Sequence, residues 1–417
     1  MQKKDQSMHW QELQQQLKYA LENSRFYQDV FKKQALYLEA MSSYKDFRKI
    51  PVTTKEQLQQ QNCDFIAVPQ EEIIDHVTTS GTLGKPVSFY LNEHDLNRLA
   101  MNEAASFKLA GITKLDKVLI TTTLDRRFMA GMAYFLGLRK LGAGAIRTGG
   151  GLPALQWESV FRFKPTYIIA VPSFLLKLIQ YAQENGIDYQ NCSIQAAICI
   201  GEPLRTSDFK LNSLGKKISS LWDIKLFSTY ASTEMATAFT ECEHHQGNHV
   251  QEDLIYTEIL DQDGNHVAEG EVGELVVTPL KVKTMPLIRF ATGDMLTYTD
   301  QTCACGRNGR RLGSVIGRRQ QKIKLKGVSL YPQHIIEILN EFNGLQNFII
   351  EVSLDQIGGD TLQILIPESF SELDVLKKHL KAGLNVTPEI ISKDSKELQQ
   401  LKFPAGSRKP KIFYDLR

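Results

Sequence analysis

Between residues 92 and 200, short apolar segments alternate with longer segments of helical periodicity. Strands are expected at residues 117–121, 167–171 and 196–200, and helices at residues 92–110, 128–141 and 174–184. This alternation favours a largely parallel sheet with helices on both of its faces. Because ligands of such sheets bind at the carboxyl ends of the strands, the residues that follow each strand are the first candidates for a site.

The length of the chain and two changes of pattern predict several parts. The chain has 417 residues, more than one compact core usually holds. Residues 254–317 show short strand patterns between turns, and residues 318–417 mix strand and helix patterns. We therefore expect an α/β protein. Its N-terminal domain, 1–317, would have mostly parallel sheets covered by helices and a β-rich subdomain at 254–317, and a small α+β domain would span 318–417.

Charge and cysteine content argue against several functional classes. The net charge of +2 provides no broad positive field for nucleic acid or an acidic membrane. The chain lacks an apolar run of the ~20 residues that span a bilayer, and its polar start is unlike a signal peptide. We therefore expect a cytoplasmic protein. Six cysteines in 417 residues also argue against a disulfide scaffold.

Residues 78–86, with the sequence TTSGTLGKP, combine hydroxyls, glycines and one lysine. Glycines allow backbone N–H groups to turn inward and form an anion-binding nest, to which hydroxyls and an ammonium add donors. The glycine spacing and the proline after Lys85 differ from a Walker A loop, which disfavours a P-loop kinase or ATPase. An ordinary hairpin-like turn is the alternative.

Further stretches, in a fixed order, give the chain a family likeness. The chain resembles the adenylate-forming superfamily of acyl- and aryl-CoA synthetases, and within it the phenylacetate–CoA ligase family. The stretches are TTSGTLGKP (78–86), PSFLLKL (172–178), IGEPL (200–204), YASTE (230–234), GELVVTPL (273–280), PLIRFATGD (286–294), CACGR (303–307), GRRQQKIKLKGVSLYP (317–332) and SRKPKIFYDLR (407–417).

The resemblance implies a ligase that uses ATP and Mg²⁺. It would join a carboxylic acid, expected to be aryl and phenylacetate-like, to the α-phosphate with release of pyrophosphate, and then transfer the acyl group to the thiol of coenzyme A. Two alternative functions stay open: an AMP-ligase that loads an aryl acid onto a carrier protein, and a non-catalytic nucleotide-binding module. The resemblance is also compatible with a homodimer.

The resemblance also implies nucleotide contacts. The loop residues Thr79, Ser80, Gly81, Thr82, Gly84 and Lys85 would wrap the β- and γ-phosphates, and Gly201, Glu202, Pro203, Tyr230, Ala231, Ser232 and Thr233 would surround the adenosine. Tyr230 offers a flat face for adenine. Asp294 would accept hydrogen bonds from the ribose, and Arg318 would bind ribose or phosphate. A core tyrosine and a turn aspartate are the alternative readings.

Two charged residues are candidates for catalysis. Glu234 would hold Mg²⁺ through a hard carboxylate oxygen, and its alternative is an acid at a helix N-terminus. Lys409, in a glycine-containing tail, would bridge the attacking carboxylate and the α-phosphate in the transition state. Lys411 is the alternative lysine. The resemblance implies that the C-terminal domain is mobile and turns about a hinge at Arg319 and Gln320.

Three cysteines and a histidine form a candidate zinc site. Cys242, His249, Cys303 and Cys305 would supply the four ligands of a structural Zn²⁺. His244 and His245 compete for the histidine position, and unpaired cysteines in a turn are the alternative.

The acid pocket is expected after the strand at 117–121. Phe128, Met129 and Gly131 would line it, whereas Arg126 and Arg127 either face solvent or meet a polar substrate. The identity of the acid stays open.

Overall fold

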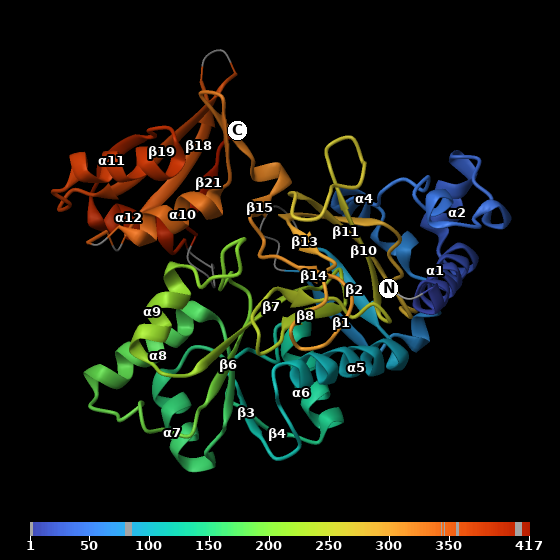
Figure 1. Ribbon diagram of the computed structural model, residues 1–417, viewed down its shortest axis with the longest axis horizontal. Coiled ribbons are helices and arrows are strands. Elements are labelled where there is room, and N and C mark those ends of the chain that lie inside the picture. Colours follow the sequence, from blue (N-terminus) through green and yellow to red (C-terminus); the bar gives the residue numbers. More distant parts are fainter. Residues whose placement is uncertain (1–2, 80–85, 343, 346, 356–357, 405–410) are drawn as a thin grey trace. The chain divides into compact units, whose positions relative to one another are not determined.

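The computed structural model describes residues 3–79, 86–342, 344–345, 347–355, 358–404 and 411–417. They form two compact units (Figure 1). The larger unit comprises residues 1–292 and 296–314, and the smaller comprises residues 293–295 and 315–417.

A nine-stranded mixed sheet forms the centre of the larger unit, in the order β13-β14-β9-β8-β7-β6-β5-β3-β4. Neighbours among β4 (Gly144–Arg147), β3 (Lys117–Ile120), β5 (Tyr167–Ala170), β6 (Ala196–Cys199) and β7 (Lys225–Ser232) are parallel. The remaining strands, β8 (Thr237–Glu241), β9 (Asn248–His249), β14 (Arg311–Leu312) and β13 (Tyr298–Thr299), pair antiparallel. The predicted parallel sheet therefore makes up half of a larger one.

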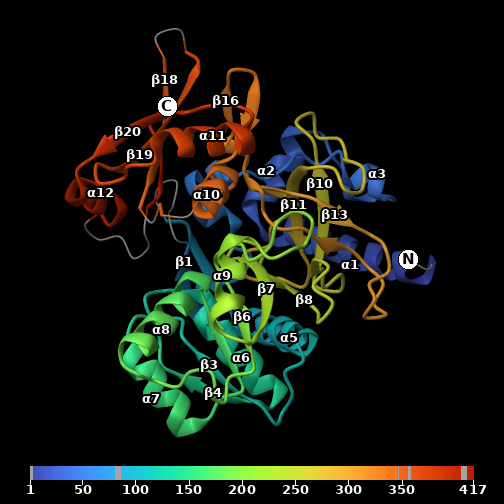
Figure 2. The same ribbon diagram turned by 60° about the vertical axis from the view of Figure 1, so that its left-hand side comes forward.

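Helices cover both faces of the parallel half (Figures 1 and 2). One face packs against α5 (Glu93–Leu109) and α6 (Met129–Leu141), and the other packs against α7 (Pro153–Phe163), α8 (Pro172–Glu184) and α9 (Ser213–Leu221). Successive strand residues point to opposite faces. Thus Ile169 packs in the core under α5 and α6, and its neighbour Ile168 packs in the core under α7, α8 and α9. Both cores exclude water, which explains the nearly continuous apolar runs of these strands.

A third core lies under the N-terminal helices α1 (Lys3–Asn23), α2 (Arg25–Lys33) and α3 (Tyr44–Phe47). Their apolar side chains, including Leu13, Leu17 and Phe47, pack with residues of the antiparallel pair β10 (Ile255–Leu260) and β11 (Gly273–Pro279). The strands expected as one β-rich subdomain at 254–317 are divided, because β13 and β14 extend the large sheet while β10 and β11 do not.

The hydroxyl- and glycine-rich stretch connects the two strands of a hairpin. β1 (Asp75–Thr78) pairs antiparallel with β2 (Ser88–Leu91). At the base of the connection, the amide of Thr79 donates to the carbonyl of Val87 at 2.9 Å. The amide of Val87 in turn donates to the Thr79 hydroxyl at 3.0 Å. Residues 80–85 lie outside the described residues.

The smaller unit is an α+β body. Its sheet has the order β20-β19-β18-β21, built from β18 (Ile349–Leu354), β19 (Asp360–Pro367), β20 (Glu389–Lys393) and β21 (Phe413–Asp415). The helices α10 (Pro332–Glu341) and α11 (Leu373–Leu384) share its main core, α12 (Ser395–Lys402) packs in a second cluster, and β16 (Ile323–Leu325) and β17 (Val328–Leu330) form a hairpin. The predicted fold class, α/β with an α+β C-terminal part, is confirmed.

Across the described part of the chain, every helix is too short or too polar to cross a membrane.

Candidate functional site

The carboxyl ends of β6 and β7 lie side by side and carry two of the predicted stretches. The strands are parallel, with Cys199 opposite Ser228. Gly201 follows β6 with a φ of +74°, a left-handed conformation that glycine adopts without a steric penalty. Tyr230 lies near the carboxyl end of β7, the strand that pairs with β6. The structure therefore brings the residues 201–203 and 230–232 to one edge of the sheet.

Glu202 is held by the first turn of α8. Its carboxylate accepts hydrogen bonds from the amide of Ser173 at 2.9 Å and from the hydroxyl of the same serine at 2.8 Å. A carboxylate at a helix N-terminus is stabilised by unpaired amides and by the helix dipole. Glu202 thus fixes the turn at 201–203 against the neighbouring strand end.

The ring of Tyr230 packs on one side against Phe239 of β8. The two ring centres are 5.9 Å apart, and the ring planes are inclined by 23°. This partial stacking orients the tyrosine ring, which is only half-buried. Beyond it, Ala231 is exposed, and Ser232 and Thr233 are half-buried. The packing suits both a core tyrosine and an adenine platform.

Glu234 lies in the four-residue turn that joins β7 to β8. Ser232 pairs with Thr237 across this hairpin, and the amide of Ala236 donates to the carbonyl of Thr233 at 3.2 Å. The alternative of an acid at a helix N-terminus does not hold, because the turn connects two strands. The Glu234 side chain is 9% exposed, and its Oε1 lies 3.2 Å from the Nζ of Lys55.

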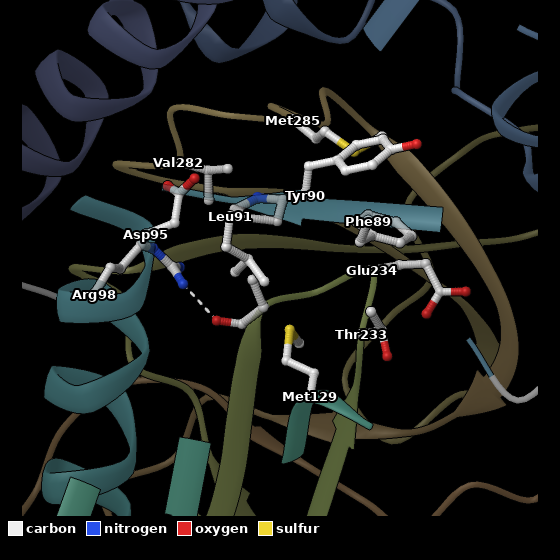
Figure 3. A pocket seen from close by; sticks show the side chains of 12 residues that line it. Phe89, Tyr90, Leu91, Asp95, Arg98, Met129, Thr233, Glu234, Val282 and Met285 are labelled. Atoms are coloured by element: carbon white, nitrogen blue, oxygen red, sulfur yellow. Dashed lines mark hydrogen bonds between the residues drawn. The ribbon is translucent and has the colours of Figure 1, made fainter. Parts of the chain in front are cut away.

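A small pocket contains Glu234 and one of the predicted acid-binding residues (Figure 3). Met129 and Thr233 line it together with side chains from β2 and from the segment that follows β11. The free volume is about 20 Å³, enough for one water molecule. Its lining residues are Phe89, Tyr90, Leu91, Asp95, Arg98, Met129, Thr233, Glu234, Ala236, Pro279, Val282 and Met285.

The other two residues expected in the acid pocket lie elsewhere. Phe128 is 39% exposed and does not belong to the pocket lining. At Gly131, an added Cβ would lie 2.0 Å from the carbonyl oxygen of Thr123, so this glycine permits the close approach of α6 to the preceding loop. Arg126 is exposed, and the carbonyl of Arg127 accepts from the amide of Thr78, which ties this loop to the hairpin.

Sequence reasoning did not single out Arg98, which anchors the same pocket from α5. Its guanidinium is buried and donates to the carbonyls of Leu280 at 2.6 Å, Leu254 at 2.5 Å and Ala236. The bond to Ala236 is drawn in Figure 3. Burial lowers the pKa of Arg98 to about 10, which leaves it charged at neutral pH. A lone arginine within an amphipathic helix pattern gives no signal of this role.

The candidate ribose residues form an ion pair within the smaller unit. Asp294 of β12 (Phe290–Leu296) faces Arg318 of β15 (Gly317–Arg318), and Nε of the arginine lies 3.4 Å from Oδ1 of the aspartate. The predicted hinge residues Arg319 and Gln320 follow in a single 3₁₀ turn. The carbonyl of Gln320 accepts from Arg417 at 3.4 Å.

Several candidates lie outside the described residues: Ser80, Gly81, Thr82, Gly84, Lys85 and Lys409. Lys411, the alternative to Lys409, is described. Its ammonium lies 4.0 Å from the ring centre of Tyr414, and its amide donates to the carbonyl of Lys402 at 2.8 Å. A cation over an aromatic face is a favourable local contact, so Lys411 has a partner within its own segment.

The four candidate zinc ligands come together in the larger unit. Their ligand atoms all lie within 4.8 Å of one another. The Sγ atoms of Cys242 and Cys303 are 3.7 Å apart, and Sγ of Cys305 is 3.8 Å from Nε2 of His249. A tetrahedron with metal–sulfur bonds of about 2.3 Å has edges of about 3.8 Å. Burial lowers the pKa of His249 to about 4, so the imidazole is neutral, as a metal ligand must be.

The competing histidine, His245, has another partner. Its Nδ1 lies 3.0 Å from the carboxylate of Glu241. That buried carboxylate also accepts from Arg205 at 2.7 and 2.9 Å and from the amide of Ser228 at 2.7 Å. Glu241 directly precedes Cys242, so the cysteine cluster and the middle of β7 are linked through one residue.

The chain is similar in sequence to known proteins over most of its length. Residues 16–281 match the family model described as AMP-binding enzyme. The chain is 29% identical to the phenylacetate-coenzyme A ligase of Escherichia coli strain K12 over 355 residues, 84% of this chain and 79% of that protein. It is 28% identical to the phenylacetate-coenzyme A ligase of Pseudomonas putida over 373 residues, 88% of this chain and 81% of that protein.

A solved structure shares the fold. The crystal structure of 2-hydroxyisobutyryl-CoA ligase in the postadenylation state superposes with a TM-score of 0.83, covering 98% of this chain and 89% of that chain at 23% identity. The family model spans well over half of the 417 residues, including the strand-end stretches described above. The chain therefore belongs to the AMP-binding enzyme family.

Proposed function

We propose that this protein is an AMP-forming ligase that joins a carboxylic acid to the thiol of coenzyme A. The observation that carries the proposal is that Glu234 and residues of β2 line the same pocket. The strand β2 directly follows the hydroxyl- and glycine-rich connection. We infer that the connection binds phosphate and that Glu234, a carboxylate suited to a divalent cation, serves the same site. The similarity to phenylacetate–CoA ligases supports the reaction type.

The first half-reaction brings two anions together. Unit charges about 4 Å apart repel by about 4 kcal/mol at an effective dielectric near 20, so phosphate charge must be neutralised. The connection at 79–87 supplies donors for the β- and γ-phosphates. The carboxylate attacks the α-phosphorus, the bond to the β-phosphate oxygen breaks, and pyrophosphate leaves. In the second half-reaction the coenzyme A sulfur attacks the acyl carbon, its proton is lost, and AMP leaves.

Glu234 is the residue proposed to hold Mg²⁺. Its carboxylate supplies the hard oxygen that this ion prefers, and its hairpin turn fixes the backbone on both sides. When bound, the ion would neutralise charge on the phosphates. Tyr230 and the turn at 201–203 would hold the adenosine at the neighbouring strand ends.

The smaller unit supplies the remaining proposed roles. Asp294, oriented by its ion pair with Arg318, would accept hydrogen bonds from the ribose hydroxyls. Lys409 would donate to the carboxylate and the α-phosphate in the transition state. Arg319 and Gln320 would serve as the hinge, with residues 318–417 as a lid that follows the domain 1–317.

The proposed acid is an aryl or related carboxylate, and the pocket sets a condition on it. A free volume of about 20 Å³ cannot hold an aromatic ring. Two methionines, Met129 and Met285, line the pocket, and an unbranched thioether side chain can move to another rotamer at small cost. Binding of an aryl acid in this pocket would therefore require these side chains to rearrange.

The cysteine cluster is proposed to hold a structural Zn²⁺. Three sulfurs and one neutral imidazole at tetrahedral spacing fit this ion better than Mg²⁺, which prefers oxygen. Since these four side chains fill a tetrahedral site completely, the bound ion would cross-link the end of β8 to β9 and to the turn at 303–306.

The proposal is tested by exchange of labelled pyrophosphate into ATP with a panel of aryl, aliphatic and hydroxylated acids. Acid-dependent exchange supports adenylation, and its absence with every acid contradicts the proposal. Coenzyme A and a phosphopantetheinylated carrier protein, added separately, then identify the acceptor. Sedimentation equilibrium measures whether the protein is a homodimer. Glu234→Gln should reduce exchange strongly while a matched amide variant on the exposed surface, Glu158→Gln, should not.

A further inference from the structure

Lys55 is the first residue of α4 (Lys55–Gln60), and hydrogen bonds fix the two residues that precede it. Thr54 caps the helix and forms a capping box with Gln57. The preceding Thr53 is buried; its amide donates to the carbonyl of Arg289 at 2.8 Å, and its hydroxyl donates to the carbonyl of Ile288 at 2.8 Å. The start of α4 is therefore anchored, and the lysine side chain is the part that can move.

The Lys55 ammonium pairs with the carboxylate proposed to bind metal. Nζ lies 3.2 Å from Oε1 of Glu234, across 179 residues of sequence. The lysine side chain is 32% exposed and the glutamate 9%, so the ammonium is more accessible to solvent than the carboxylate. A carboxylate this buried requires a nearby cation or several hydrogen bonds.

We propose that Lys55 is the counter-ion of Glu234 in the nucleotide-free enzyme, which Mg²⁺ displaces, and that the released ammonium then binds the phosphates. This inference rests on the proposed function, because it takes Glu234 as the metal ligand. A metal and an ammonium on one carboxylate oxygen repel each other. Lysine can yield the position because its charge is carried on a flexible four-carbon stem.

The distances imply that the lysine ammonium moves only a short way in this exchange. Mg²⁺ binds oxygens at about 2.0–2.1 Å, so oxygens of Glu234 and of a phosphate on the same ion lie about 3–4 Å apart. Nζ already lies 3.2 Å from the glutamate oxygen. A phosphate oxygen held by a metal on Glu234 would therefore be within reach of the ammonium after a change of lysine rotamer.

The exchange predicts effects of opposite sign when the lysine charge is removed. Without the competing ammonium, a divalent cation alone should bind Glu234 more tightly. Without the ammonium that faces the phosphates, the metal–nucleotide complex should bind more weakly. An ion pair that only ties α4 to the β7–β8 turn would change both affinities in the same direction, since its loss loosens the site for both.

The test compares Lys55→Gln with Lys55→Arg and the wild-type protein. Mn²⁺ binding is measured by electron paramagnetic resonance, first with the metal alone and then with α,β-methylene-ATP, which cannot transfer its adenylyl group to an acid. For Lys55→Gln we expect about threefold to fivefold tighter Mn²⁺ binding, the range of a partly exposed ion pair. Analogue binding in the presence of Mn²⁺ should weaken by at least about tenfold, as for a hydrogen bond to a charged group.

The charge-retaining Lys55→Arg should stay close to wild type in both measurements, and circular dichroism and the melting temperature verify that both variants fold. Unchanged affinities, or shifts of the same sign, in a folded Lys55→Gln protein overturn the inference. Glu234→Gln separates this failure from that of the metal assignment, because it should abolish tight Mn²⁺ binding in an otherwise wild-type protein. Pyrophosphate exchange by the wild type tests the proposed function independently of all three variants.

Discussion

The Sγ atoms of Cys242 and Cys303 lie 3.7 Å apart although 61 residues separate them in the chain. This spacing is too long for a disulfide and matches the edge of a tetrahedral zinc–thiolate site. Cys242 follows β8, and Cys303 lies in a turn after β13, the edge strand of the sheet. The cluster therefore connects two strands of the antiparallel half of the sheet. Burial raises the pKa of the Cys242 thiol to about 12, so without a metal the thiol keeps its proton at neutral pH. A bound cation would favour the thiolate, which is the form that binds metal.

The first prediction concerns metal content and stability. Protein purified without chelator should contain about one zinc per chain by mass spectrometry, as a Cys₃His site binds one ion. Cys303→Ser should lose the zinc and lower the melting temperature, because structural zinc contributes on the order of 10 kcal/mol to folding. Cys63→Ser changes an exposed cysteine away from the cluster and should do neither. Metal-free protein with an unchanged melting temperature in Cys303→Ser would contradict the prediction.

The second prediction concerns the two tail lysines. Lys409→Ala should reduce pyrophosphate exchange by about 10²–10³-fold, the usual effect of removing one donor that acts in the transition state. ATP binding, measured calorimetrically, should stay within a small factor of wild type, because that contact forms only during reaction. Lys411→Ala is the matched control, since its ammonium already lies over Tyr414. If Lys411→Ala shows the large loss and Lys409→Ala does not, the roles are reversed.

Parts of the site could be predicted from sequence for a clear physical reason. Parallel strands place their carboxyl ends at one edge, so the stretches after β6 and β7 had to be neighbours once the alternating pattern was recognised. The Cys and His residues carried their own signal, because three sulfurs and an imidazole have few other joint roles. The helix-and-strand alternation predicted both covered faces of the parallel half.

Other parts depend on tertiary packing that no local pattern encodes. The ion pair of Lys55 and Glu234 joins residues 179 apart through the hairpin turn and an anchored loop. The continuation of the sheet through β13 and β14 reflects pairing with β9, whereas the sequence pattern of 254–317 indicated only short strands. Gly131, predicted to line the acid pocket, also lets α6 approach the carbonyl oxygen of Thr123, a contact that only the fold reveals.

The third prediction separates those two roles of Gly131. In Gly131→Ala the new Cβ would lie 2.0 Å from the Thr123 carbonyl oxygen, so the backbone must shift. Overpacking of this kind typically costs about 1–3 kcal/mol, and we expect a matching fall in urea resistance regardless of which acid is present. Gly150→Ala is the control, because its nearest neighbour, the Thr121 carbonyl, would lie 3.4 Å away. A stable Gly131→Ala protein with altered acid preference would instead support the pocket role.

The fourth prediction concerns the pH dependence of stability and Glu103. Glu103 is buried where α5 packs on α6. A Cβ added to Gly137 of α6 would lie 2.3 Å from the Cβ of Glu103. Burial raises the pKa of Glu103 to about 8 from an ordinary value of 4.5. The folded protein therefore keeps the proton to a higher pH than the unfolded chain. Stability from this group is fully present below pH 4.5 and is lost as the pH rises towards 8.

Glu103→Gln removes this titration while keeping the size of the side chain. Its stability relative to wild type should therefore rise between pH 5 and pH 8, by an amount on the order of a few kcal/mol, since each unit of pKa difference corresponds to about 1.4 kcal/mol. Urea unfolding at pH 5, 6.5 and 8 measures the trend. Glu93→Gln, an exposed position on the same helix, controls for the general loss of a negative charge from α5. A stability difference that stays constant across this range would mean that Glu103 is charged in the folded protein, and its burial beside Gly137 would then require a cation from the surrounding core.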